Sequence, residues 1–142
     1  MSIAIDESIY ERFTADKASG TVYAAVYGRI SAEYGGHAAE LPYVVFDNTA
    51  TETIPIAFAT NNDLMTRADY EIRVYSHWEE GVEVVGDISE LVVKLFNQYA
   101  DSTVTNFDKV VYDVIGGTTV TRADEILVAT VRIRATGVQS TF

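Results

Sequence analysis

The stretch YEIRVYSHWEEGVEVVGDISELVVKLF, residues 70–96, changes its hydrophobic period partway along, and this change decides the fold. Its first residues alternate, with Tyr70, Ile72 and Val74 on one side and Glu71, Arg73 and Tyr75 on the other, which is typical of a half-buried strand. From residue 82 onward apolar residues recur every three or four positions, which predicts an amphipathic helix of about 18 residues. A strand that runs directly into such a helix indicates a domain of the α+β class.

The elements on either side follow from the same periodicities. Apolar spacing predicts an N-terminal helix from Ile3 to Phe13, then a short helix and a short strand within residues 21–31. We expect further strands at 41–47, 54–59, 109–115 and 126–135, a loop at 60–69 and a turn at Gly116-Gly117. The expected fold is a small α+β single domain spanning residues 1–142. Its mostly antiparallel sheet of about four to five strands packs against one long amphipathic helix, with the N-terminal helix added.

Composition excludes several classes of protein. The net charge is −11, from 21 acidic and 10 basic residues, which argues against nucleic-acid binding through a basic patch. The chain has no cysteine, so disulfides, thiolate nucleophiles and cysteine zinc sites are excluded. The N-terminus lacks the basic and apolar regions of a signal peptide, and no run approaches the roughly 18–20 apolar residues of a membrane helix. We therefore expect a soluble protein.

The segment SHWEEG, residues 76–81, gathers reactive side chains: His77, the only tryptophan, and two glutamates. A metal site needs three or four convergent ligands, and the only other histidine is His37 in a glycine-rich loop. The chain contains no phosphate-binding glycine motif and no nucleophile elbow. We interpret the segment as a structural corner, where the glutamates suit the start of a helix. The expectation is a protein that is not an enzyme, with no metal and no cofactor.

Four residues are candidates for a subunit interface: Arg73, Trp78, Arg132 and Arg134. The arginines lie on the expected exposed faces of two strands, and Arg and Trp are favoured at protein interfaces. We expect a sheet edge or this exposed strand face to meet an acidic neighbour. The alternative is a solvated edge strand for Arg132 and Arg134, and packing on the sheet edge for Trp78.

A resemblance to a known family rests on the order of several short motifs. These are Gly28-Arg29-Ile30, the run LPYVVF at 41–46, and the strand 70–76 that leads into a helix at 79–99 and a C-terminal hairpin. In this order they resemble the tail-terminator, or tail-completion, family of long-tailed phages over roughly residues 5–135. The segment between Phe46 and Tyr70 is longer than the family leads us to expect.

The resemblance implies a structural virion protein, assembled in the host cytoplasm. Such proteins form a hexameric ring on the head-proximal end of the tail tube, stop its polymerisation, and bind the tail tube protein and the head-completion or connector protein. DNA passes through the lumen without specific binding, and an acidic lumen would not grip phosphates. No membrane is involved. The alternatives are a head-side connector or stopper of the neck, a small ligand-binding α+β domain, or a small enzyme using His37 and His77.

Overall fold

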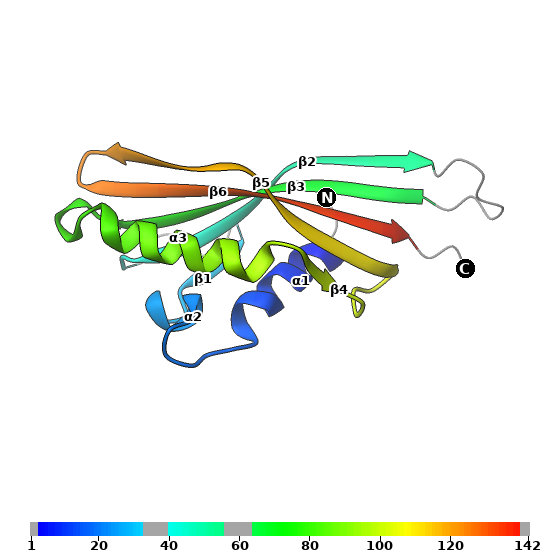
Figure 1. Cartoon of the computed structure of the whole chain (residues 1–142), viewed down its shortest axis with the longest axis horizontal. Coiled ribbons are helices and arrows are strands. Elements are labelled where there is room, and N and C mark those ends of the chain that lie inside the picture. The colour runs from blue at the N-terminus through cyan, green and yellow to red at the C-terminus, as the bar shows by residue number, and fades with distance from the viewer. Residues whose placement is uncertain (1–2, 33–39, 56–63, 140–142) are drawn as a thin grey trace.

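A six-stranded sheet dominates the protein, with both longer helices on one of its faces (Figure 1). The computed structural model describes residues 3–32, 40–55 and 64–139. The strand order is β1-β2-β3-β6-β5-β4, and all neighbouring strands are antiparallel except the β1–β2 pair. The elements are α1 (Ile3–Thr14), α2 (Val22–Ala25), β1 (Ile30–Ala32), β2 (Tyr43–Pro55), β3 (Leu64–His77), the 3₁₀ turn η1 (Trp78–Glu80), α3 (Val82–Phe96), β4 (Tyr99–Asp101), β5 (Phe107–Ala123) and β6 (Ile126–Gln139).

The predicted architecture, a mostly antiparallel sheet of about four to five strands packed against one long amphipathic helix plus an N-terminal helix, is wrong, because the sheet dominates the molecule. The sheet has six strands, curls into a half-barrel and forms most of the molecule. The two longer helices are similar in length, α1 with 12 residues and α3 with 15, so no single long helix supports the sheet. The error arose because we ended the strands where their apolar runs end, whereas the strands continue through polar, threonine-rich sequence.

The continued strands replace a predicted loop and a predicted turn. Residues 64–69, expected to be a loop, belong to β3 and pair with β2 as far as Pro55; residues 56–63 lie outside the described chain. Gly116 and Gly117 lie at a bulge between Ile115 and Thr119 instead of at a turn. The β5–β6 hairpin turns at Asp124, whose positive φ of 54° suits an aspartate. Threonine is favoured in strands because its branched side chain packs well on a pleated surface.

The core lies between the sheet and the two longer helices. Alternate residues of β3, including Tyr70, Ile72 and Val74, are buried against the helices, which confirms the alternation seen in the sequence. Phe96 of α3 is fully buried and meets Phe13 of α1 edge to face, with ring centroids 5.2 Å apart. The aromatic contact ties the two helices to each other as well as to the sheet.

A buried polar network holds α1 on the sheet. Ser8 donates a hydrogen bond of 2.6 Å to Oδ2 of Asp101 in β4, and the Tyr112 hydroxyl donates to Ser8 at 2.7 Å. The backbone N–H and the hydroxyl of Thr103 donate to Oδ1 of Asp101. Burial alone would raise the pKa of Asp101, but the hydrogen bonds from Ser8 and Thr103 outweigh it and lower the pKa below its ordinary value of 3.8.

Replacing Ser8 with alanine is expected to destabilise the fold in a pH-dependent way. At pH 7 the variant loses the charge-assisted hydrogen bond to Asp101 and leaves the Tyr112 hydroxyl without its acceptor, and we expect its free energy of unfolding to fall by at least about 1.5–3 kcal/mol. Because the folded pKa of Asp101 is depressed, its stabilisation is present above pH 4 and is lost as the pH falls through the folded pKa. The difference between the two proteins should therefore shrink in acid. Urea titrations at pH 7 and pH 3 test this, with the exposed Ser102→Ala as control; an equal difference at both pH values contradicts it.

Candidate functional site

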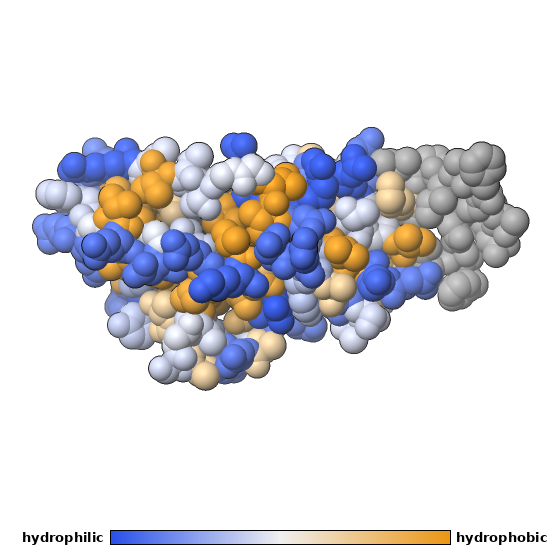
Figure 2. All heavy atoms as spheres, viewed as in Figure 1, coloured by the Kyte–Doolittle hydropathy of each residue, from blue (hydrophilic) through white to orange (hydrophobic). Residues whose placement is uncertain are grey.

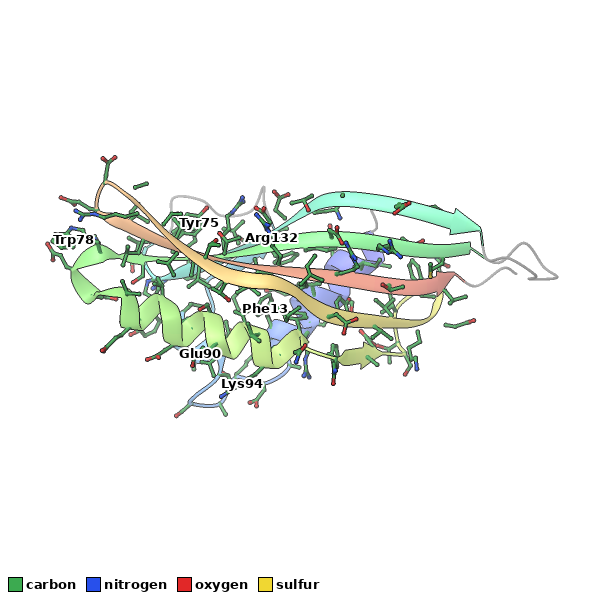
Figure 3. All side chains as sticks on the ribbon, turned by 45° about the horizontal axis from the view of Figure 1, so that its top comes forward. Phe13, Tyr75, Trp78, Glu90, Lys94 and Arg132 are labelled. Carbon is green, nitrogen blue, oxygen red and sulfur yellow. The ribbon has the colours of Figure 1, made fainter. Side chains whose placement is uncertain are left out.

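The face of the sheet turned away from the helices, here called the outer face, is covered by none of the described residues. In Figure 3 Tyr75 and Arg132 lie along the sheet, whereas Glu90 and Lys94 lie on the helix beyond its other face. Its side chains include Tyr43, Val45, Asp47, Ala50, Glu52, Arg67, Asp69, Glu71, Arg73, Tyr75, Val111, Asp113, Ile115, Thr119, Thr121, Val128, Thr130, Arg132, Arg134 and Thr136. Acidic and basic groups are interspersed, so this face is close to neutral on a chain of net charge −11.

Strand register produces the charge compensation. Asp69 lies directly opposite Arg134, and Glu71 lies opposite Arg132, in the β3–β6 pair. Arg134 makes a two-point contact with Asp69, from Nε to Oδ1 at 2.8 Å and from Nη2 to Oδ2 at 3.3 Å. These hydrogen bonds and the charge of Asp69 raise the pKa of Arg134. Cross-strand pairs of opposite charge are favourable, so two candidate interface residues have carboxylate partners within the same chain.

Arg73 and Arg132 share the carboxylate of Glu71. Nη1 of Arg73 lies 3.8 Å from Glu71 and 4.0 Å from Asp47, and Nε of Arg132 lies 3.7 Å from Glu71. The Arg132 side chain is 60% exposed, against 26% for Arg73. Arg132 is therefore the most accessible of the three candidate arginines. The alternative that it lies on a solvated edge strand is wrong, because β6 lies between β3 and β5.

Trp78 lies at the corner between β3 and α3, as the sequence suggested, in the 3₁₀ turn η1. Its backbone N–H donates to the carbonyl of Glu125 in the β5–β6 turn, and the guanidinium of Arg122 lies 4.3 Å from the centre of its ring. The side chain is 40% exposed, and Val82 and Val120 are also exposed. Figure 2 shows hydrophobic residues reaching the surface at this end of the molecule. Exposed Trp beside Arg is typical of a protein contact.

His77 faces an open hollow of about 690 Å³, which Leu41, Arg122 and Ile126 also line. Within residues 3–32, 40–55 and 64–139, no group of three or more His, Cys, Asp or Glu side chains could hold a metal ion. His37, the other histidine of the alternative enzyme reading, lies outside the described residues. The absence of enzymatic activity stays a prediction. None of the described helices is long and apolar enough to cross a membrane.

The excess negative charge lies on the helical side instead of the outer face. Along η1 and α3 five exposed acids face solvent with a single exposed lysine, Lys94. The acids are Glu79, Glu80, Glu83, Asp87 and Glu90. The molecule is thus two-sided: one face is strongly acidic, and the other is charge-compensated with half-buried aromatic and aliphatic side chains.

Comparisons with known proteins identify the fold. No family model matches the chain, and no curated protein is similar to it in sequence. A chain from the virion of a native gene transfer agent (GTA) particle superposes with a TM-score of 0.60 at 12% identity, covering 92% of this chain and 91% of that one. A second solved structure, which carries no descriptive name, gives a TM-score of 0.62 at 13% identity over 98% of this chain and 96% of its own. At these identities the likeness establishes a shared fold over nearly the whole of each chain.

Proposed function

We propose that this protein is a structural component of a phage-like virion, and that it forms a ring at the head-proximal end of the tail tube. The observation that carries the proposal is the fold shared with a chain of the GTA virion over 92% of this protein. The order of motifs that resembles tail terminators points the same way. In this role the ring, a hexamer, stops polymerisation of the tube and offers its other side to the head-completion protein.

Two properties of the surface support assembly with copies of itself. A chain of net charge −11 repels its own copies, except where opposite charges compensate each other, and the outer face is such a place. A ring also needs heterologous contacts, in which one patch meets a different patch on the neighbour. We propose that Arg132 and Trp78 take part in these contacts, with Arg73 and Arg134 keeping the outer face ordered through their own carboxylate partners.

The acidic helical side fits the passage of DNA. Clustered carboxylates repel phosphates, so a lumen that included the exposed acids of η1 and α3 would let duplex DNA slide without binding it. The function proposed is non-enzymatic and needs no metal or cofactor. Its place of action is the virion, after assembly in the host cytoplasm.

A head-side connector or stopper in the neck is the second candidate, because it would share the ring geometry and the virion context. A small ligand-binding domain is less well supported, since nothing marks the described hollows for a particular ligand. Co-sedimentation of the purified protein separates the candidates. We expect it to sediment with tail tubes built from the particle's own tube protein and not with the portal complex. Sedimentation with the portal alone would assign it to the head side, and sedimentation with neither would remove both virion roles.

A further inference from the structure

The sheet has two long edges that none of the described residues covers. β1 pairs only with Val44–Phe46 of β2, so Asp47–Pro55 has a free side. β4 pairs only with Val110–Tyr112 of β5, so Asp113–Ala123 has a free side as well. Each free segment is roughly 30 Å or more of extended backbone. Along each, every second N–H and C=O points away from the sheet.

Proteins that stay monomeric usually protect such edges with charges, prolines or short strands. The segment Thr118–Thr121 of β5 has neither a charge nor a proline, and its β-branched residues favour extended pairing. On β2, the bulge at Asn48 is satisfied internally, because the Asn48 amide donates to the carbonyls of Ala50 and Asp69. The rest of that segment, through Thr53, keeps its regular register with β3. Both edges are therefore suitable for adding another strand.

The topology makes the two edges complementary. The four long strands, β2, β3, β6 and β5, alternate in direction across the sheet, so β2 and β5 run antiparallel to each other. If a second copy in the same orientation is placed beside the first, its β2 therefore lies antiparallel to the first copy's β5. If β5 paired with β5 across a two-fold axis, the free backbone groups of β5 would be hydrogen-bonded, but those of β2 would stay unpaired. Pairing β2 with β5 satisfies both edges and continues from copy to copy.

The positions of the two free segments define how the copies must be shifted. The strand registers show which residues lie side by side across the sheet, at the same position along the strand direction. Ala50 is level with Arg134, Thr119 with Thr130, and Thr121 with Val128. Pairing Ala50 with Thr119 of the neighbour shifts the copies by four residues of β6, roughly 13 Å; pairing it with Thr121 shifts them by six residues, roughly 20 Å. Over a repeat of four strands, about 19 Å wide, these shifts tilt the strands by about 35° and 45°. Closed barrels have tilts in this range.

We propose that the ring is built by strand addition, with Asp47–Pro55 of one copy paired antiparallel to Asp113–Ala123 of the next. The inference rests on the proposed function and names its partner surface. With Ala50 opposite Thr119, the two free segments overlap along most of their length, apart from the bulge of β5 between Ile115 and Thr119, and neither β1 nor β4 has to move. Glu52 of the neighbouring copy then lies opposite Gly117, on the face that carries Arg132. A Cβ at Gly117 would meet no atom within 4 Å, so this position leaves room for the Glu52 side chain to extend toward Arg132.

The test uses engineered disulfides, because the chain contains no cysteine. One variant carries Ala50→Cys and Thr119→Cys, and a second carries Ala50→Cys and Thr121→Cys. Opposed Cα atoms in an antiparallel pair lie about 4.5–5.5 Å apart, within reach of a disulfide. Within one chain β3 and β6 separate the two positions by roughly 14 Å, so no internal bridge can form. On oxidising rings assembled on tail tubes, we expect one of the two variants to give a ladder of linked copies on a non-reducing gel.

The controls separate this inference from the proposed function. Each single cysteine variant should stay unlinked, because a heterologous contact never brings a residue to its own copy. The pair Ala50→Cys and Ser102→Cys should also stay unlinked, since Ser102 lies off the edge. If rings remain visible by electron microscopy but neither variant forms linked copies, strand addition is overturned, while the proposed ring on the tail tube stands. Linked dimers from Thr119→Cys alone would show a two-fold contact and overturn it too. If no ring forms on the tubes, the proposed function fails and strand addition fails with it.

Discussion

Replacing Phe96 with alanine is expected to lower the free energy of unfolding by about 3–5 kcal/mol, the largest stability effect that we anticipate for a single change. Phe96 has no exposed surface, and its ring contacts Phe13 at 5.2 Å and Tyr112 at 5.6 Å between centroids. The truncation would leave a cavity where α1, α3 and the sheet meet. Neighbouring elements would relax only partly into it, so the loss includes packing as well as transfer of the ring to water.

Urea unfolding followed by circular dichroism measures this loss. The matched control is Val82→Ala on the same helix, because Val82 is 59% exposed and its truncation should change the stability by no more than about 0.5 kcal/mol. If Phe96→Ala cost less than about 1 kcal/mol, α3 would not pack on the sheet as described.

The second large effect is expected from charge reversal on the outer face. The double change Arg132→Glu and Arg134→Glu should reduce ring formation on tail tubes by at least about tenfold, because like charges across an interface cost several kcal/mol. The new carboxylates would lie beside Asp69 and Glu71, and each copy would become more negative than −11. Ring occupancy on tubes, counted by electron microscopy, is the measurement.

A single change, Arg132→Glu, keeps the Arg134–Asp69 pair and so separates assembly from folding. It should reduce ring formation while leaving the unfolding midpoint close to that of the wild type, since Arg132 is 60% exposed. Lys94→Glu on α3, which lies away from the outer face and is exposed, makes the same change in net charge and is the control. Normal rings from a folded double variant would remove the arginines from the interface.

The sequence predicted the parts of the fold where hydrophobic period and burial agree. The alternation of residues 70–76 and the three- to four-residue spacing from Val82 to Phe96 both correspond to observed elements. Prediction from the sequence failed where strands extend beyond the hydrophobic core. Residues 118–123 of β5 are exposed on both faces, so their stability depends on pairing with β6, and no apolar pattern in their own sequence records it. The short strand β4 was missed because its three residues are too few to show an alternating pattern.

The alternation predicted that Arg73 lies on the exposed face of its strand, but not the charge balance of that face, and the role of the candidate residues in an interface stays a prediction. The alternation that buries Tyr70 and Ile72 necessarily puts Asp69, Glu71 and Arg73 together on the other face. Their pairing with Arg132 and Arg134 depends on the register between strands that are about 60 residues apart in the chain. Register is a long-range property, fixed by the burial of both strands at once. The expected acidic neighbour for these arginines is therefore partly supplied by the chain itself.

The most direct test of the proposed ring is the length of tails in particles assembled without this protein, measured by negative-stain electron microscopy. Without a terminator nothing stops the addition of tube subunits, so we predict overlong tubes that carry no heads. Restoring the wild-type protein should return tails to a single length, and Arg132→Glu should do so incompletely. Tails of normal length that fail to join heads would assign the protein to the head side of the neck. Normal infectious particles would contradict the account.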